Sequence, residues 1–181
     1  MSKETILDVK GNELYFAKLR EGAKIPTKDS ENAGYDIYAC FDEDFILIEP
    51  HETKMIPTGL CSACSEDYVI VLKERGSTGT KGIGQRCGII DSGYRNEWFI
   101  PITNTTDKVI IIAKDIEKFE KNPTCCIQKG SCDMIIYPYT KAICQALLLP
   151  VPRMEVKEIS AQQLQRIPSK RGMGALGSSG K

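Results

Sequence analysis

A tight turn between two apolar runs carries the most reactive residue pair of this sequence. The segment Gly88–Arg95 places a carboxylate, Asp91, three residues before an aromatic ring, Tyr94, and the apolar run Trp98–Ile102 follows. A positioned carboxylate can act as a general base toward water, and a flat ring beside it can pack on a sugar. The pair predicts a small pocket that reads a nucleoside and activates a water molecule.

Two further segments combine one arginine with glycines and hydroxyls. They are Arg75–Gly82 and Arg171–Gly180. Glycines let backbone amides converge on an anion, and arginine can hold a phosphate through two hydrogen bonds. The first segment lacks the Gly-Lys-Ser/Thr order of a P-loop and no helical pattern follows it, so it is either a generic anion loop or a basic hairpin turn. The second is either a disordered terminus or a lid that closes over a ligand.

Composition restricts the classes of function. The 181 residues fit one domain, and 24 basic residues balance 24 acidic ones. Zero net charge argues against nucleic-acid binding and against docking on anionic membranes. No apolar run reaches the roughly 18–20 residues that span a bilayer, and the first residues lack the apolar core of a signal peptide. We therefore expect a cytoplasmic protein with no nucleic-acid or membrane partner.

The cysteine and histidine residues restrict the possible catalytic mechanisms further. Eight cysteines in a cytoplasmic chain are expected to be free thiols. Cys61 and Cys64 have the CxxC spacing of a metal site, and their only plausible partners are Cys125, Cys126 and Cys132. Because no second CxxC pair completes four ligands, a zinc site is the less favoured alternative. The single histidine, His51, lies in a turn-like segment. Carboxylates, arginines, hydroxyls and a borrowed metal ion therefore remain for catalysis.

Short runs of β-branched and aromatic residues, separated by Gly, Pro, Asn and Asp, predict an all-β fold of mostly antiparallel strands. The expected strands are 13–17, 45–48, 68–72, 98–102, 109–112 and 143–149, with a further strand start near Tyr35. Single helical turns are expected at 115–120 and at 160–165, the latter with a Ser160/Gln163 capping box. We interpret 1–166 as one β-barrel domain with an insert at about 113–139, and 167–181 as a flexible Gly/Ser-rich lid.

Five segments, in this order, resemble the five motifs of the trimeric dUTP pyrophosphatases (dUTPases). They are 33–39, 75–81, 88–95 continuing to 104, 143–147 and 171–180. The resemblance implies a jelly-roll-like β-barrel and a homotrimer with an exchanged C-terminal segment. It also implies Mg²⁺-dependent hydrolysis of dUTP to dUMP and pyrophosphate, which keeps uracil out of DNA and supplies dUMP for dTMP synthesis.

The resemblance also assigns roles to individual residues. Asp91 would activate the water that attacks the α-phosphorus, and Asp36 would lie in the water shell of a Mg²⁺ ion held mainly by the triphosphate. Tyr94 would pack on the deoxyribose. The remaining substrate-binding residues implied by the resemblance are Arg75, Gly76, Ser77, Gln85, Gly88, Ile90, Gln145, Arg171, Leu176, Gly177, Ser178 and Ser179.

Three departures from the family pattern affect substrate binding. The second motif reads Arg75-Gly76-Ser77 rather than Arg-Ser-Gly/Ser, so Ser77 or the Gly76 amide takes the place of the usual serine. The sequence 140–142 replaces a usual Gly-Asp-Arg, and Leu176 replaces an aromatic ring that stacks on uracil. These changes affect affinity more than reaction type.

Two other functions are compatible with the resemblance. A related dCTP deaminase would need a glutamate base beside the pyrimidine, and the segment 88–95 has none. A nucleotide-binding regulator with weak turnover is suggested by the altered second and fourth motifs. The insert at 113–139 is similar to that of bacteriophage-type members, some of which also contact a regulatory partner. It is therefore either an elaborated loop or a binding site for a regulatory protein partner.

Overall fold

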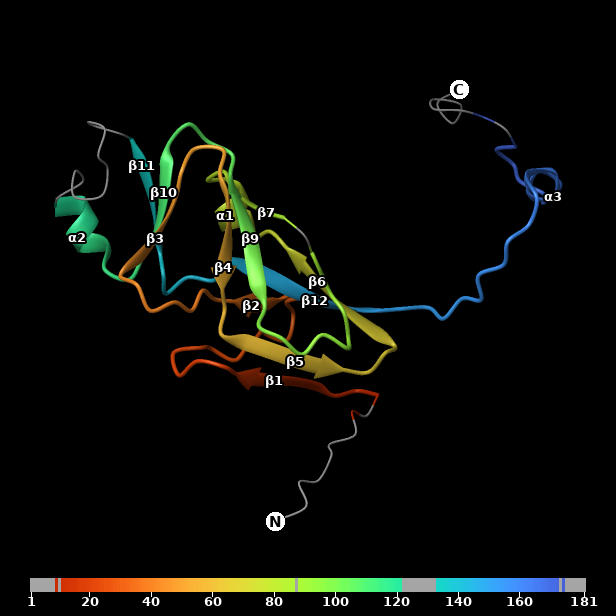
Figure 1. Ribbon diagram of the computed structural model, residues 1–181, viewed down its shortest axis with the longest axis horizontal. Helices are drawn as coiled ribbons and strands as arrows, with labels where there is room; N and C mark the ends of the chain where they lie inside the picture. The colour runs from red at the N-terminus through yellow and green to blue at the C-terminus, as the bar shows by residue number, and fades with distance from the viewer. Residues whose placement is uncertain (1–8, 10, 87, 122–132, 173, 175–181) are drawn as a thin grey trace, which may run out of the picture. The chain divides into compact units, whose positions relative to one another are not determined.

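The computed structural model describes residues 9, 11–86, 88–121, 133–172 and 174 (Figure 1). Contacts between Cα atoms divide the chain into two compact units, Met1–Val151 and Pro152–Lys181. This division lies before residue 166, where composition had suggested the end of the barrel domain.

The described part of the first unit is built almost entirely from short strands, as the sequence predicts. In chain order they are β1 (Leu14–Lys18), β2 (Tyr35–Ile37), β3 (Phe45–Ile48), β4 (Thr53–Pro57), β5 (Leu60–Cys64), β6 (Tyr68–Lys73), β7 (Ile83–Gln85), β8 (Ile89–Ile90), β9 (Phe99–Asn104), β10 (Val109–Ala113), β11 (Met134–Pro138) and β12 (Cys144–Pro150). Two short helices join them, α1 (Gly76–Gly79) and α2 (Ile116–Lys121).

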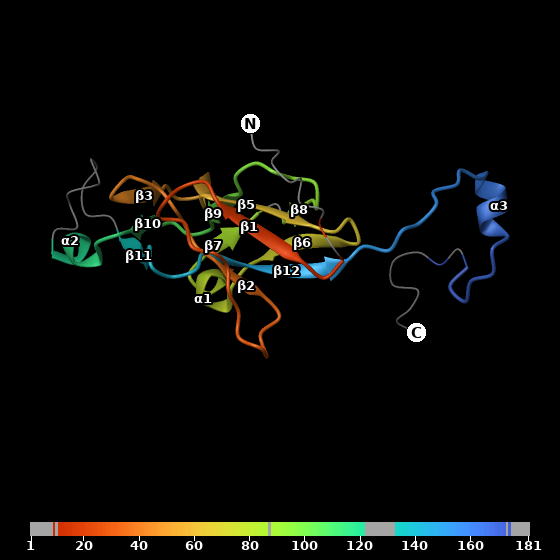
Figure 2. The same ribbon diagram turned by 90° about the horizontal axis from the view of Figure 1, so that it is seen from below.

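These strands form sheets in the orders β1-β5, β11-β10-β3, β2-β12-β6-β8 and β4-β9-β7. Antiparallel pairing dominates, as expected, and β10 with β11 is a parallel pair. The helix α1 follows β6 in the chain and contacts β7, and Figure 2 shows it near the start of β12. The sheet β2-β12-β6-β8 therefore brings together strands from three separated parts of the sequence, near residues 35, 68–90 and 144–150.

One hydrophobic core connects the sheets. Buried isoleucines from β2, β3, β4, β6, β7, β9 and β10 pack around Trp98, which is fully buried. Phe16 of β1 meets the Trp98 ring edge-on, with 5.5 Å between ring centroids. The strand β10 is buried on both faces, because Ile110 and Ile112 face this core while its alternate residues face a second cluster.

The predicted insert is narrower in the structure than in the sequence. Met134–Pro138, which seemed to interrupt the strand rhythm, forms β11 and pairs with β10. The Tyr139 amide donates to the carbonyl of Ala113 at 2.8 Å and closes the base of the excursion. Its described part outside the sheet is therefore 114–121 and 133, with α2 tied to Asp44 through Lys118.

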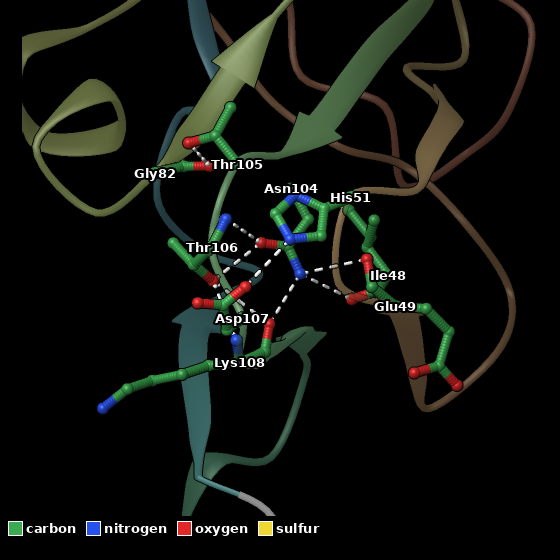
Figure 3. A network of polar contacts seen from close by, with 9 residues as sticks. All are labelled: Ile48, Glu49, His51, Gly82, Asn104, Thr105, Thr106, Asp107 and Lys108. Atoms are coloured by element: carbon green, nitrogen blue, oxygen red, sulfur yellow. Dashed lines mark hydrogen bonds and ion pairs between the residues drawn. The ribbon is translucent and has the colours of Figure 1, made fainter.

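A buried asparagine joins the turn after β3 to the turn after β9 (Figure 3). The Asn104 amide donates to the carbonyls of Ile48, Glu49 and Lys108 at 3.1, 3.0 and 2.6 Å. Its oxygen accepts from the amide and hydroxyl of Thr106. His51, exposed as expected for a turn residue, lies beside this network with its ring 2.9 Å from the carboxylate of Asp107.

We expect Asn104→Ala to lower the free energy of unfolding by at least about 2 kcal/mol, because each buried carbonyl left without a donor costs roughly 1–3 kcal/mol. Thr105→Ala is the matched control, since Thr105 is exposed and its hydroxyl donates to the Gly82 carbonyl at 3.0 Å. Urea denaturation of both variants measures the difference. Equal stabilities would show that the Asn104 network does not hold the two turns.

The second unit contains α3 (Ala161–Gln165), which begins with the predicted capping box. The Ser160 hydroxyl accepts from the Gln163 amide, and the Gln163 side chain accepts from the Ser160 amide at 2.9 Å. All described residues of this unit are exposed. In the described part of the chain, no helix is long and apolar enough to cross a membrane.

Candidate active site

The predicted carboxylate and ring line one cavity at the end of β8. Asp91 and Tyr94 form a turn in which the Tyr94 amide donates to the Asp91 carbonyl at 3.0 Å. The Tyr94 hydroxyl donates to the Glu97 carbonyl at 3.1 Å, which fixes the direction of the ring. The cavity measures about 340 Å³ and is lined by Met55, Ile89, Ile90, Asp91, Tyr94 and Phe99. This combination can hold a flat ligand beside an accessible carboxylate.

Gly88 attaches this turn to β6. Its carbonyl accepts a hydrogen bond from the Leu72 amide at 2.6 Å. A Cβ atom at residue 88 would lie 2.9 Å from the Leu72 carbonyl oxygen. A glycine is therefore required for the backbone of the turn to approach the strand so closely.

A second, polar cavity of about 590 Å³ lies toward the β2 edge of the sheet in which β8 forms the other edge. It is lined by Asn32, Ala33, Gly34, Asp36, Arg75, Gly76, Ser77, Gln145 and Leu147. Strand register brings these residues together, because Asp36 of β2 pairs with Gln145 of β12, and Gln145 pairs with Lys73 of β6. The segment that contains Arg75 follows directly.

Asp36 and Arg75 form a two-point ion pair within this cavity. The Arg75 Nε lies 3.2 Å from one carboxylate oxygen of Asp36, and Nη2 lies 3.3 Å from the other. Both side chains are about one-third exposed. The third guanidinium nitrogen, Nη1, lies 3.4 Å from the carbonyl of Ala142. The cationic group is thus held at the cavity wall while part of it stays accessible to an anion.

The glycine and hydroxyl segment after Arg75 forms a helical turn, α1, where the sequence predicts only a loop. Thr78 causes this difference, because its buried hydroxyl donates to the Arg75 carbonyl at 2.9 Å and accepts from the Arg75 amide at 3.2 Å. The first amides of a helix have no acceptor inside it. The turn therefore presents the backbone of Gly76 and Ser77 to the cavity.

Comparisons with known proteins identify the family of this chain. The dUTPase family model matches residues 20–117. The chain belongs to the dUTPase family. A deoxyuridine 5'-triphosphate nucleotidohydrolase of Nautilia profundicola is 31% identical over 172 residues, covering 93% of this chain and 99% of the relative.

Solved dUTPase structures share the fold. A dUTPase of Staphylococcus bacteriophage 80alpha, solved with dUpNHpp, has a TM-score of 0.69 at 24% identity and covers 94% of this chain and 99% of its own. A mutant dUTPase of phage phi11 of S. aureus, described with a structural Mg(II) ion, has a TM-score of 0.61 at 20% identity, covering 82% and 97%. The predicted jelly-roll-like β fold of this dUTPase is confirmed.

Gln145 lies at the centre of the polar cavity of this dUTPase. Its side-chain amide donates to the Glu74 carbonyl at 3.1 Å. A Cβ atom on Gly34 would lie 2.8 Å from the Gln145 side-chain oxygen, so a larger residue at position 34 would displace this side chain. Gln85, also predicted to bind substrate, lies on β7, where its amide donates to the Glu74 carboxylate at 3.1 Å.

Cys144, next to Gln145, does not supply a thiolate. The residue is fully buried, and burial raises the pKa of its thiol to about 12. The described residues contain no cluster of three His, Cys, Asp or Glu side chains that could chelate a metal. Cys61 and Cys64 therefore have no further zinc ligands among the described residues.

The predicted residues of the fifth motif lie in the second unit or outside the described residues. Arg171 is in the second unit, where its Nε donates to the Gly174 carbonyl at 3.1 Å. Leu176, Gly177, Ser178 and Ser179 lie outside the described residues. In the first unit, Asp91 and the Arg75 group line two cavities that share no residue.

One residue that the sequence did not indicate lies behind Arg75 of the polar cavity. Tyr137 of β11 directs its buried hydroxyl to the Ala142 carbonyl, which Arg75 also contacts. No spacing rule could have found it, because Tyr137 lies in the segment interpreted as an insert.

Proposed function

We propose that this dUTPase hydrolyses dUTP to dUMP and pyrophosphate, with Mg²⁺ as cofactor. The observation that carries the proposal is the cavity in which Asp91 and Tyr94 lie together, with Gly88 fixing the turn before them. The polar cavity around Arg75 supplies the complementary phosphate-binding groups. The family and the name of the Nautilia relative support the same reaction.

In the proposed mechanism, Asp91 accepts a proton from a water molecule as that water attacks the α-phosphorus. The new bond joins the water oxygen to the α-phosphorus, and the bond to the bridging oxygen breaks to release pyrophosphate. The proton on Asp91 then passes to solvent. Tyr94 orients the deoxyribose, and the backbone of 88–91 with Ile90 and Gln85 contacts the base. Positioning and charge neutralisation dominate such phosphoryl chemistry.

Arg75, Ser77 and Gln145 bind the phosphates in this proposal, with the Gly76 amide beside them. Mg²⁺ fits this set of donors, because it usually keeps several waters and binds through one or two carboxylates and the substrate phosphates. Asp36 is the carboxylate available in the polar cavity, and it would act through the water shell while it also restrains Arg75. When bound, Mg²⁺ would neutralise charge on the triphosphate.

The separation of the two cavities supports a homotrimer in which each site combines residues of different chains. Asp91 and Tyr94 of one chain would meet the Arg75 group of a neighbour. The exposed apolar residues Met55, Ile89 and Phe99 around Asp91 are suited to burial against a second chain. The segment 167–181 would close the site and contribute Arg171, Leu176, Gly177, Ser178 and Ser179.

The insert at 113–139 would bind a regulatory protein.

Pyrophosphate release from dUTP, dCTP, dTTP and UTP, measured with Mg²⁺ and with a chelator, tests the proposal. We expect metal-dependent release from dUTP alone. Ammonia release from dCTP would instead identify a deaminase. Thermal protection by dUTP without any release would identify a nucleotide-binding regulator.

A further inference from the structure

The Tyr137 hydroxyl is a buried polar group that shares the Ala142 carbonyl with Arg75 of the polar cavity. Tyr137 is 1% exposed and forms part of the main hydrophobic core. Its hydroxyl donates to the Ala142 carbonyl at 2.6 Å. The Arg75 Nη1 lies 3.4 Å from the same carbonyl. One backbone oxygen therefore couples the buried phenol to the guanidinium that also pairs with Asp36.

The Tyr137 side chain interacts with several residues of the segment 75–81. Burial raises the pKa of Tyr137 above its ordinary value, while a hydrogen bond with Ser77 and the charge of Arg75 act in the opposite direction. The Lys81 ammonium lies 5.8 Å from the centroid of the Tyr137 ring. The start, middle and end of the segment 75–81 thus converge on one side chain of β11.

We propose that Tyr137 is a positioning residue that holds Arg75 and Ser77 in the geometry that binds the phosphates of the substrate. The inference rests on the proposed function, because it assigns Arg75 and Ser77 to phosphate binding. Tyr137 itself need not touch substrate, since it is buried behind both residues.

The physical advantage is preorganisation. A free arginine loses side-chain rotamer entropy when it binds an anion. Contacts with Asp36 and the Ala142 carbonyl restrict Arg75 before substrate arrives, and the Tyr137 hydroxyl fixes that carbonyl. Without the hydroxyl, Ser77 and the Ala142 carbonyl each lose a buried partner, and the segment becomes less ordered.

Tyr137→Phe tests this inference, because it removes the hydroxyl and retains the ring. The hydroxyl joins neutral groups, the Ala142 carbonyl and Ser77, and the loss of such a bond typically changes an equilibrium by roughly three- to tenfold. We therefore expect the affinity for inorganic pyrophosphate to fall by roughly three- to tenfold. Calorimetric titration measures it in the presence of Mg²⁺. Deoxyuridine, which has no phosphate, should bind within about twofold of its wild-type affinity. The KM for dUTP should rise with pyrophosphate's dissociation constant.

Tyr139→Phe is the matched control. Tyr139 is two residues away and packs edge-on against Phe41 at 4.9 Å between ring centroids. Its hydroxyl hydrogen-bonds the Cys40 side chain and the Phe41 backbone, neither of which belongs to the segment 75–81. This variant should bind both ligands as the wild-type protein does.

Unchanged pyrophosphate affinity in Tyr137→Phe would overturn the inference, and so would equal weakening of both ligands with a lower melting temperature. A wild-type protein that binds pyrophosphate but does not hydrolyse dUTP would reject the proposed function alone. Should Tyr137→Phe fail to fold, NMR of ¹³C-tyrosine-labelled wild-type protein decides. Saturating pyrophosphate should shift the Tyr137 ring signals and leave those of Tyr139 in place, and an unmoved Tyr137 signal would overturn the inference.

Discussion

The variant Asp91→Asn is expected to hydrolyse dUTP at least about a hundredfold more slowly than the wild-type protein, because a general base contributes roughly 10²–10⁴-fold to the rate. Asparagine has nearly the shape of aspartate but cannot accept the proton of water. The hydrogen bond that holds this turn uses the backbone oxygen of Asp91, so the cavity should remain intact. Steady-state pyrophosphate release measures turnover, and thermal protection by dUTP measures binding.

Asp107→Asn is the matched control for this experiment. Asp107 is also an exposed turn carboxylate, but it lies beside His51 in the turn after β9 (Figure 3). We expect its turnover to equal that of the wild-type protein. Retention of dUTP binding by Asp91→Asn with lost turnover supports a role in the chemical step. Near-normal turnover in Asp91→Asn would remove Asp91 as the base.

The sequence predicted strands where burial makes apolar runs continuous and missed them where pairing compensates for weak composition. Phe45–Ile48 and Val109–Ala113 are rich in isoleucine and were correctly located to within one residue. Leu60–Cys64 consists largely of small residues, and it is a strand because it pairs along its whole length with β1. Met134–Pro138 was assigned to the insert, and the parallel pairing with β10 could not be read from local pattern.

The residue types of the candidate site could be predicted from the sequence, but their arrangement in space could not. The residue types of Asp36, Arg75 and Gln145 were recognisable, whereas the cavity they share depends on the register between β2, β12 and β6. The helical turn α1 depends on one hydroxyl, that of Thr78, whose burial no periodicity indicates.

The lost arginine of the fourth motif shows the same limit. Ala142 replaces the arginine that is usual in the fourth motif, and from the sequence we interpret this change as weaker phosphate binding. In the structure, the carbonyl of Ala142 accepts from Tyr137 and lies 3.4 Å from Arg75. The backbone oxygen of residue 142 therefore contacts both Tyr137 and Arg75, although comparison of side chains at this position shows only the loss of an arginine.

Removal of residues 171–181 is expected to lower turnover of dUTP roughly a hundredfold without unfolding the β domain. The loss would follow from the missing phosphate contacts of Arg171 and the two serines, since removing one oxyanion donor costs about 10²–10³ in rate. Stability should persist because every described residue of Pro152–Lys181 is exposed and α3 is capped by its own Ser160 and Gln163. Pyrophosphate release and the melting temperature measure the two effects separately.

Point variants identify the group responsible. Arg171→Ala should reproduce much of the loss, and Lys170→Ala, which removes the neighbouring positive charge outside the fifth motif, should not. Equal small losses in both would indicate a nonspecific effect of charge on the approach of the triphosphate, which added salt would abolish. An unchanged rate in the truncated protein would mean that the segment is a terminus without a part in catalysis, and the lid assignment would then fail independently of Asp91.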